Sequence, residues 1–423
     1  MTEPATSFTD TRKLEVVVLG GGFAGLTFCQ HLEHPRYHVT LVDRQNHHLF
    51  QPLLYQVATG GLSAPEIAQP LRSILADHKN VTTLMDEVKE IDLEGKEVIT
   101  QEHTLPYDYL IIALGAKTGY FGRNDWAPFT LGLKSLDEAL TLRRRVLEAF
   151  ERAEACNDPV AIKRLLTMVI VGGGPTGVEL AGSLAELSRV VFQHDFRRID
   201  PSKTEVHLIE AGSKLLSMFP GDLPEYTVER LKKMGVTVHL DTRVEQVGQG
   251  FVVAGGQRID SEIVIWAAGV EASGVTRTLA GVPLDKCGRI HVLPDLSLPG
   301  HREVFAAGDL VNMVDAKGQR VPGVSPAAMQ MGTHIARILN SGDSDRPAFT
   351  YWDKGSMATI GRSAAVADFA GMQFRGFIAW MMWLFVHLVF LVGMRNRLTV
   401  FMQWMWSYFT WKRGARIIIG HEE

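Results

Sequence analysis

Two stretches decide the fold: Leu14–Gly25, LEVVVLGGGFAG, and Thr167–Gly177, TMVIVGGGPTG. Each is an apolar, β-branched run that enters a glycine turn, and the residues that follow predict a helix. Each turn fits G-x-G-x-x-G between a strand and a helix, the context in which this motif binds a dinucleotide. The copies lie 152 residues apart. They predict an α/β protein with two Rossmann-like domains, each holding its own dinucleotide.

The glycines of each turn have separate tasks. The first permits the tight turn, the second lets the backbone approach a pyrophosphate, and the third lets the helix pack on its strand. The N-terminus of the helix then faces the anion. The alternative is a glycine-rich turn without a ligand, and the duplication argues against it. The residues assigned to these tasks are Gly20, Gly22 and Gly25 in the first copy and Gly172, Gly174 and Gly177 in the second.

A carboxylate ends the second strand of each copy. Asp43 ends VTLVD, 23 residues beyond Gly20, and Glu210 ends VHLIE, 38 residues beyond Gly172. The longer second spacing is explained by an extended connection over residues 190–203. A carboxylate at this position accepts hydrogen bonds from ribose hydroxyls and repels a 2'-phosphate. The sequence therefore predicts NADH rather than NADPH as the nicotinamide cofactor.

Three further buried strands end at a small residue, where a bulky side chain would collide with a cofactor. The first two end at Gly115 and Gly269, each downstream of its own repeat, and the third ends at Gly308, which Asp309 follows. The alternative is an ordinary strand exit into a turn. The pairing of these strand ends with the two repeats favours cofactor contact.

Composition narrows the function classes. The chain has 423 residues, of which 46% are hydrophobic and 21% charged, so it is globular and long enough for two or three domains. A formal charge of -4 gives no basic excess and argues against nucleic acid as a partner. Cys29, Cys156 and Cys287 are far apart, which argues against a disulfide framework, a zinc site or an iron–sulfur cluster. We predict no metal site, and the polar start of the chain carries no secretory signal.

The C-terminal segment from about Gly376 has a different composition. Phe377–Met394 carries no formal charge, and residues 377–419 contain five of the eight tryptophans and several cations but no acid. Aromatic residues with cations are typical of a membrane interface. As a helix the first run would extend about 27 Å, which is marginal against a hydrocarbon core of about 30 Å.

The second apolar run favours a helix that lies in one leaflet. A narrow polar stripe recurs there every three or four residues, at Asn396, Thr399, Gln403, Ser407 and Thr410. The basic cluster Lys412, Arg413 and Arg416 would lie on the wrong side of a membrane if the first run spanned it. The alternative is a buried helix pair or the seam of a homodimer.

The two glycine turns with Gly308 and Asp309 resemble the two-dinucleotide flavoprotein reductase superfamily. More specifically, the segments His47–Gly60, Gly172–Gly182 and Ala327–Gln330, with the tryptophan-rich tail, are similar to the type II NADH:quinone oxidoreductases. The resemblance covers nearly the whole chain. It implies a monotopic, non-proton-pumping respiratory enzyme that passes electrons from NADH through one FAD to a membrane quinone.

The resemblance also assigns residues to ligands. It gives FAD the first glycine turn with Asp43, Gly308 and Asp309, and it gives NADH the second turn with Glu210. Because small residues leave room for a cofactor, Gly115, Ala327 and Ala328 are assigned to FAD and Gly269 to NADH. The resemblance places Glu179 near the flavin and quinone as a proton-relay or charge-tuning group, whereas the residue pattern alone explains Glu179 as a carboxylate in the opening turn of a helix. Gln51 and Gln330 are the remaining candidates for the quinone end, Gln51 by resemblance alone.

One residue departs from the pattern of the family. Its quinone motif often carries two glutamines four residues apart, but the first position here is Pro326 and only Gln330 remains. The residues themselves indicate a helix start, with proline in the first turn and the small residues Ala327 and Ala328 allowing close packing. Both interpretations are compatible.

The predicted organisation is an FAD domain split by an inserted NADH domain. It comprises residues 1–120 (FAD domain, first part), 121–160 (linker with an amphipathic helix), 161–283 (NADH domain), 284–375 (FAD domain, second part) and 376–423 (C-terminal amphipathic membrane-anchoring helices). The expected location is the cytoplasmic face of the cell membrane, peripherally bound, with a possible homodimer.

Two rival functions remain at this point. One is an NADH-dependent flavin reductase with a soluble or protein acceptor, and the other is a membrane-tethered flavin redox sensor without steady turnover. Reductases of the superfamily that act on disulfides or sulfide need paired cysteines, which this chain lacks. Electrons would therefore leave the flavin directly, and the apolar tail favours an apolar acceptor such as a quinone.

Overall fold

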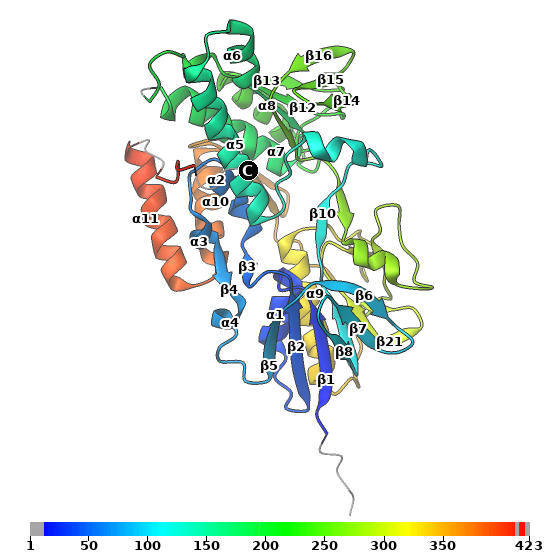
Figure 1. The fold of residues 1–423 in the computed structure, drawn as a ribbon. Coiled ribbons are helices and arrows are strands. Elements are labelled where there is room, and N and C mark those ends of the chain that lie inside the picture. Colours follow the sequence, from blue (N-terminus) through cyan, green and yellow to red (C-terminus); the bar gives the residue numbers. More distant parts are fainter. Residues whose placement is uncertain (1–11, 194, 411–413, 419–423) are drawn as a thin grey trace, which may run out of the picture. The chain divides into compact units, whose positions relative to one another are not determined.

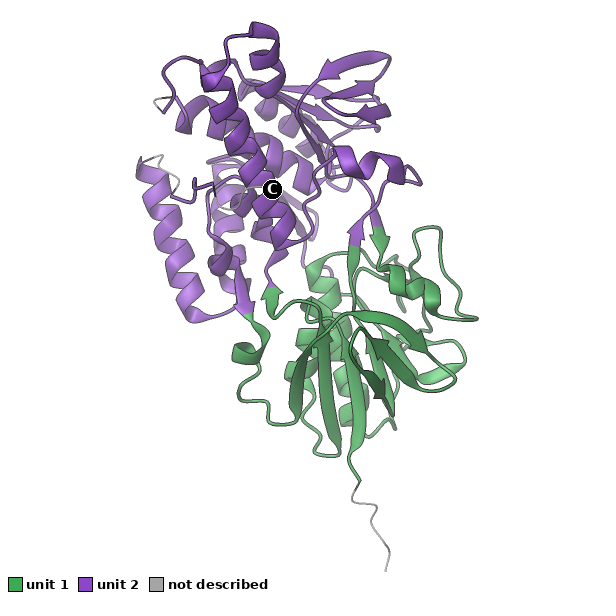
Figure 2. Cartoon of the chain, in the orientation of Figure 1, with its two compact units in different colours: residues 1–48, 70–116, 271–352 green, residues 49–69, 117–270, 353–423 purple. Residues whose placement is uncertain are grey.

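The computed structural model describes residues 12–193, 195–410 and 414–418. The chain divides into two compact units (Figure 2): unit 1 comprises residues 1–48, 70–116 and 271–352, and unit 2 comprises residues 49–69, 117–270 and 353–423. These units differ from the predicted domains, because residues 49–69 and the whole segment from 353 onwards group with the second glycine turn. Residues 1–11, Trp411, Lys412 and Arg413, on which sequence-based expectations rest, lie outside the described residues.

Unit 1 is built on a sheet of the order β20-β21-β9-β1-β2-β5. All neighbouring strands are parallel except β20, which runs antiparallel to β21. The bounds of these strands are Leu14–Leu19 (β1), Tyr37–Asp43 (β2), Val81–Met85 (β5), Tyr109–Ile112 (β9), Ser297–Leu298 (β20) and His301–Ala306 (β21). The chain reverses direction across the sheet between β1 and β9, so the first glycine turn leaves β1 at a topological switch point, where ligands bind in such sheets.

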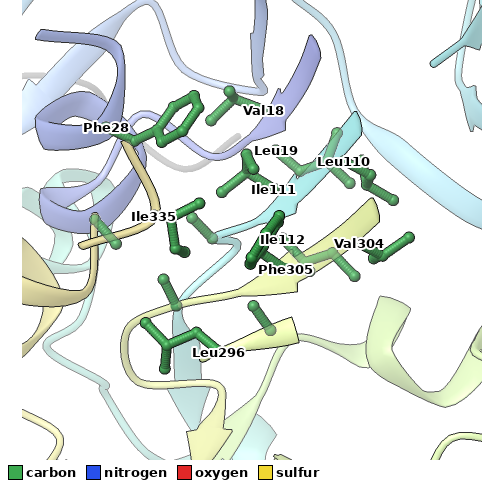
Figure 3. Close-up of a cluster of buried hydrophobic side chains, with 14 of the residues drawn as sticks. Val18, Leu19, Phe28, Leu110, Ile111, Ile112, Leu296, Val304, Phe305 and Ile335 are labelled. Carbon is green, nitrogen blue, oxygen red and sulfur yellow. The ribbon is translucent and has the colours of Figure 1, made fainter. Parts of the chain in front are cut away.

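The core of unit 1 explains why the apolar run of β1 is continuous rather than alternating. A strand at the centre of a parallel sheet is covered on both faces. Val18 and Leu19 of β1 and Ile111 of β9 are fully buried, and the side chains of Phe28 and Ile335 from the flanking helices lie in the same cluster (Figure 3).

The other elements of unit 1 flank this sheet. The helices are α1 (Phe23–His31), α4 (Leu71–Ile74) and α9 (Ser325–Asn340), and the small strands are β6 (Val88–Asp92), β7 (Glu97–Thr100), β8 (Thr104–Pro106), β19 (Ile290–His291) and β22 (Val311–Asn312). Helices α1 and α9 pack closely, because a Cβ on Gly332 would overlap the carbonyl oxygen of Ala24. Pro326 lies in the first turn of α9, as predicted.

Unit 2 repeats the same plan with the all-parallel order β13-β12-β11-β17. These strands are Thr167–Val171 (β11), Glu205–Ile209 (β12), Val236–His239 (β13) and Ile263–Trp266 (β17). Every residue of β11 is buried. The second glycine turn leaves β11 at the switch point between β11 and β17, so the prediction of two Rossmann-like domains is confirmed.

Helices and two small antiparallel sheets complete unit 2. The helices are α2 (Leu54–Ala58), α3 (Ala64–Ile67), α5 (Leu136–Ala155), α6 (Pro159–Leu165), α7 (Pro175–Glu186), α8 (Leu223–Lys233), α10 (Phe377–Phe390) and α11 (Met394–Thr410). The small sheets are β14 (Val244–Gly248), β15 (Phe251–Ala254) and β16 (Gln257–Asp260), and β23 (Ser356–Thr359), β24 (Ala365–Phe369) and β25 (Met372–Gly376). Helix α5 is the amphipathic helix predicted between the repeats, and a capping box of Ser135 and Glu138 fixes its start. The chain passes between the units at β3 (His47–Leu49), β4 (Ala68–Pro70), β10 (Ala116–Thr118) and β18 (Val270–Ala272), and again between residues 352 and 353.

The two C-terminal helices pack on each other and on the rest of unit 2 (Figure 1). Aromatic rings join them, with Trp380 against Tyr408 and Trp383 against Trp404. Trp383 is the largest fully buried side chain among the described residues, so α10 is anchored in the fold of unit 2. Within the described residues, we find no helix with both the length and the apolar character needed to cross a bilayer.

Candidate functional site

The two glycine turns have the same local geometry. The first glycines, Gly20 and Gly172, have φ of +101° and +112°, a left-handed region that favours glycine. A Cβ on the third glycines, Gly25 and Gly177, would overlap the carbonyl oxygen of the first glycine in the same turn. The predicted tasks of the first and third glycines therefore agree with the geometry.

The helix that follows each turn begins without a side-chain cap. Gly22 and Gly174 are the N-caps of α1 and α7, and neither helix has a side-chain cap among the described residues or an acid in its first turn. A Cβ built on Gly22 or Gly174 meets no described atom within 4 Å. Space and the positive end of the helix dipole together suit a pyrophosphate.

Asp43 and Glu210 hold the glycine turns together. One Asp43 oxygen accepts a hydrogen bond from the backbone N–H of Gly21 at 2.6 Å, and one Glu210 oxygen accepts the equivalent bond from Gly173 at 2.6 Å. The second oxygen of each carboxylate accepts from a backbone N–H two residues further on, at 2.7 Å. Both carboxylates are therefore fixed at the edge of the turn, as an acceptor for ribose hydroxyls must be.

His48 of β3 contacts the first turn, and the sequence analysis quoted its segment without singling it out. Its Nδ1 hydrogen-bonds to the carbonyl oxygen of Gly21 at 3.0 Å, and its ring meets Phe23 edge to face. Burial lowers the pKa of His48, so it is neutral and Nδ1–H donates to that carbonyl. Hydrogen bonds with Asp43 and His48 thus use both the N–H and the carbonyl of Gly21.

Two of the strand ends predicted to contact FAD lie near the first turn. Gly20 packs on the carbonyl of Ala113, close to Gly115, and a Cβ on Gly308 would lie 3.6 Å from the side chains of Ala24 and Ala328. Ala327 and Ala328 are buried at the start of α9. Asp309 follows Gly308 shortly after β21, beside Gly323. Their contact with FAD stays a prediction.

Gly269 has a packing reason of its own. Its φ is +72°, and a Cβ there would lie 2.5 Å from the carbonyl oxygen of Gly119 and 2.9 Å from the ring of Phe121. This explains glycine at the end of β17 without a ligand. Its assignment to NADH stays a prediction.

The two glutamines predicted at the quinone end are already hydrogen-bonded. The Gln330 side chain donates to the carbonyl of Trp352 at 3.0 Å and accepts from its N–H at 2.9 Å, and Gln51 donates to the carbonyl of Lys134 at 3.1 Å. Gln330 belongs to unit 1 and Gln51 to unit 2. Both side chains thus hydrogen-bond to the backbone of another segment. To contact a quinone, each amide would have to share or give up these hydrogen bonds.

Glu179 is a buried carboxyl group, and its predicted place in the opening turn of a helix is wrong. Helix α7 begins at Pro175, so Glu179 is in its second turn, where the dipole contributes little. The carboxyl accepts a hydrogen bond from the backbone N–H of Thr359 at 3.4 Å, and the nearby Thr359 hydroxyl also lowers its pKa. Burial nevertheless raises the pKa of Glu179 to about 8, so the group is protonated over much of the neutral range.

A cavity of about 110 Å³ lies beside Thr359, within unit 2. Aromatic side chains of the two C-terminal helices, Trp380, Trp383, Trp404 and Tyr408, form one wall, and hydroxyl-bearing residues form much of the other. The indole N–H of Trp383 is buried and has no acceptor among the described residues. The cavity thus combines apolar walls with a few convergent polar groups, which is typical of a small-molecule site.

The outer surface of α10 and α11 is strongly apolar. Exposed side chains include Phe385 (69% exposed), Met402 (64%) and Phe409 (72%), and they accompany Ile378, Met381, Met394, Leu398, Phe401, Met405 and Trp406. Of the predicted polar stripe on α11, Asn396, Gln403, Ser407 and Thr410 are only partly exposed, whereas Thr399 is exposed. The helices thus present an apolar face outward, the reverse of a helix that borders water.

Comparison with known proteins gives consistent matches over most of the chain. Residues 14–332 match the family Pyridine nucleotide-disulphide oxidoreductase, and residues 353–412 match the NDH2 C-terminal domain. Two Mycobacterium tuberculosis proteins are similar throughout: Type II NADH:quinone oxidoreductase Ndh, 42% identical over 96% of this chain and 90% of its own length, and NdhA, 40% identical over 95% and 89%. The fold matches the structure of NDH2 from Plasmodium falciparum in complex with NADH, with a TM-score of 0.89, 21% identity, and coverage of 97% of this chain and all of the other.

Proposed function

The chain belongs to the type II NADH:quinone oxidoreductase family and transfers electrons from NADH to a quinone, and we propose how its residues divide this work. Unit 1 holds FAD and unit 2 holds NADH. The buried carboxyl of Glu179, next to a cavity walled by the C-terminal helices, serves the quinone. The observation that carries the assignment to the quinone is the burial of an acid that Thr359 compensates only in part, since a protein does not retain such a group for stability.

The residues of unit 1 fit FAD. Gly22 leaves room for a pyrophosphate beside uncapped N–H groups of α1, and Asp43 is fixed by Gly21 with lone pairs left for a ribose. Gly308 and Asp309 border the same surface and would meet the remainder of the cofactor. When bound, FAD accepts a hydride from NADH and passes two electrons to the quinone.

The residues of unit 2 fit NADH in the same manner. Gly174 and the uncapped start of α7 suit its pyrophosphate, and Glu210 suits the adenosine ribose. The negative charge of Glu210 disfavours the 2'-phosphate of NADPH. We therefore assign NADH as the preferred donor.

Reduction of a quinone consumes one proton from the medium in addition to the hydride, because NADH, a quinone and a proton give NAD⁺ and a quinol. Glu179, protonated near neutral pH, is the group in unit 2 that holds such a proton away from bulk water. The unpaired indole N–H of Trp383 in the neighbouring cavity is a suitable donor to a quinone carbonyl. Gln51 and Gln330 remain candidates for the quinone end, once their present hydrogen bonds are shared.

The apolar face of α10 and α11 is the part that we assign to the phospholipid surface. It is too large and continuous for a water-exposed surface, and its aromatic residues suit the interface. This assignment makes the protein peripheral and monotopic, on the cytoplasmic face of the cell membrane. A second copy of the chain is the competing occupant of this face.

The test of the function is a purified preparation with a visible flavin spectrum. We expect it to oxidise NADH continuously when a ubiquinone or menaquinone analogue is supplied, and to stop after one flavin reduction without it. A colourless protein that takes up no flavin would overturn the assignment of FAD. Reduced flavin that is reoxidised by soluble acceptors but never by a quinone would overturn the assignment of a quinone as the electron acceptor.

The lipid assignment calls for surface substitutions, because truncation would remove the buried Trp383. We expect Phe385→Glu with Phe409→Glu to abolish binding to phospholipid vesicles while flavin content stays normal, since each charge must enter an apolar layer. Phe121→Glu, at an exposed apolar residue of unit 2 outside these helices, is the matched control. Unchanged vesicle binding, or conversion of a wild-type dimer to a monomer by the double substitution, would favour the dimer seam.

A further inference from the structure

A continuous hydrogen-bonded chain connects helix α11 to Glu179. Trp404 Nε1 donates to Gln56 Oε1 at 2.8 Å, and Gln56 Nε2 donates to the Tyr55 hydroxyl at 3.1 Å. The Tyr55 hydroxyl lies 3.0 Å from Thr359 Oγ1. Thr359 in turn donates its backbone N–H to Glu179 Oε1 at 3.4 Å, and its hydroxyl lies close enough to lower the pKa of that carboxyl. All five residues belong to unit 2, although they come from four different elements.

The indole of Trp404 fixes the direction of the first two bonds in this chain. An indole N–H can only donate, so Gln56 must turn its oxygen towards Trp404 and its N–H₂ towards Tyr55. The Tyr55 oxygen then accepts from Gln56, which leaves its own hydrogen available for Thr359 Oγ1. When Tyr55 donates to Thr359, the Thr359 hydrogen is in turn available for Glu179. In that orientation the hydroxyl hydrogens are directed towards the carboxyl group, which is the arrangement that a proton needs to arrive there.

The two hydroxyls of the chain border a cavity with room for water. Tyr55 and Thr359 both line the cavity of about 110 Å³. A single buried water needs at least about 10–15 Å³, so the cavity has room for several. Gln56, Thr59, Ser183 and Ser407 supply further polar groups to its wall. Amide and indole N–H groups do not release protons, so a proton enters the chain at Tyr55 or Thr359 and not at Gln56.

The surroundings contain no competing carboxylate between Tyr55 and Glu179 in the described part of unit 2. The pKa of Glu179 is raised by burial and lowered only by Thr359. The pKa of Tyr55 is raised by burial and then by the charge of Glu179, with a smaller contribution from Glu186. Glu186 and Arg362 are the charged groups on the cavity wall, and Glu186 accepts the backbone N–H of Arg362.

We propose that the hydroxyls of Tyr55 and Thr359 conduct the proton from water in the cavity to Glu179, with Gln56 and Trp404 holding them in the required orientation. This inference rests on the proposed role of Glu179 in supplying a proton for quinol formation. In each cycle Glu179 releases one proton, an O–H bond of Thr359 breaks as its proton moves to Glu179, Tyr55 refills Thr359, and cavity water that has taken up a proton from the medium refills Tyr55. No electron moves in this chain.

The test compares hydroxyl deletions with a matched control. Tyr55→Phe and Thr359→Val remove one link each, and Thr359→Ser restores the link. Thr227→Val is the control, because Thr227 is a buried threonine of α8 whose hydroxyl bonds only to a backbone carbonyl within that helix. We expect the first two variants to lower quinone turnover about tenfold or more, to increase its solvent deuterium isotope effect, and to leave reduction of the flavin by NADH unchanged. The serine and control variants should behave like the wild type.

A second measurement needs no quinone. The infrared carboxyl band that Glu179→Gln removes identifies Glu179, and its exchange in D₂O follows delivery of the proton. We expect slower exchange in Tyr55→Phe and Thr359→Val. Wild-type exchange and wild-type turnover in both variants would overturn the relay. A wild-type protein that never reduces a quinone, with slowed exchange in the variants, would instead overturn the proposed function and leave the relay standing.

Discussion

The two glycine turns are near copies in backbone, but the groups around them differ. Gly21 and Gly173 both donate to a carboxylate at 2.6 Å. The carbonyl of Gly21 then receives the His48 side chain, whereas the carbonyl of Gly173 receives the backbone N–H of Leu216 at 2.8 Å. The helices differ more: two residues beyond the third glycine, α1 has Thr27 and α7 has Glu179, both buried. The turn that both copies share suits nucleotide binding. The buried carboxyl of Glu179, in place of the Thr27 hydroxyl, gives the second copy an acid that the first one lacks.

The largest expected effect comes from substituting the third glycine, which strains both glycine turns in the same way. Gly25→Ala and Gly177→Ala each place a Cβ against the carbonyl of the first glycine, and the strain should destabilise the turn by about 1–3 kcal/mol or more. We expect Gly25→Ala to lose flavin, measured by absorbance per protein, and Gly177→Ala to keep flavin but lose NADH binding. If either variant lost the other ligand instead, the assignment of the two turns would be reversed.

Glu179→Gln tests the difference between the helices. We expect quinone turnover to fall about 100-fold while flavin reduction by NADH continues, because an amide cannot release a proton. Thr27→Val, the corresponding position of α1, should leave the proton-coupled step unaffected. A Glu179→Gln variant with normal turnover would show that the second helix carries no chemistry of its own.

The same residue makes stability depend on pH. Burial raises the pKa of Glu179 from its ordinary value of 4.5 to about 8, so the folded state binds more protons than the unfolded state between these values. Stability contributed by this group is therefore full below about pH 4.5 and is lost as pH rises through about 8, by up to about 5 kcal/mol. We expect the Tm advantage of Glu179→Gln over the wild type to grow from pH 5 to pH 9. A constant difference would contradict the raised pKa.

A smaller effect concerns the two strand-end carboxylates. We expect the wild type to prefer NADH to NADPH in kcat/KM, and Glu210→Gln to narrow this preference roughly tenfold by removing the charge that repels a 2'-phosphate. Asp43→Asn should change flavin affinity and leave the ratio of the two donors unchanged. Equal use of NADH and NADPH by the wild type would refute the role of Glu210.

The smallest expected effect comes from removing the His48 side-chain hydrogen bond to Gly21, which has no side-chain counterpart in the second turn. His48→Phe removes the hydrogen bond to Gly21, which we expect to cost about 1 kcal/mol and to weaken FAD binding several-fold in the apoprotein. His48→Asn retains a donor and should restore part of the affinity. Binding of NADH should not respond, because Leu216 holds the second turn by its backbone. Equal FAD affinity in the wild type and both variants would show that FAD binding does not depend on this hydrogen bond.

Candidate site residues were predicted with unequal success. The glycines and carboxylates follow from local spacing, and the structure places them together around their turns. Gln330 and Gln51 were chosen by resemblance, and the structure shows each amide bonded to a backbone carbonyl. Thr359 had no signal in the sequence at all, since a threonine on a short strand is ordinary. His48 and Tyr55 did lie in a quoted motif, but only their contacts distinguish them from core residues.

The sequence by itself determined the two nucleotide-binding turns, because their demands are local: a positive φ, a missing Cβ, and a carboxylate at the end of the next strand. Only the tertiary structure decided the surroundings of Glu179, because burial and hydrogen bonding depend on residues far apart in the chain. Thr359 lies 180 residues from Glu179, and Tyr55 lies 304 residues from Thr359. Tertiary packing also placed the apolar side of α11 outward, since periodicity gives the faces of a helix but not the direction in which each one points.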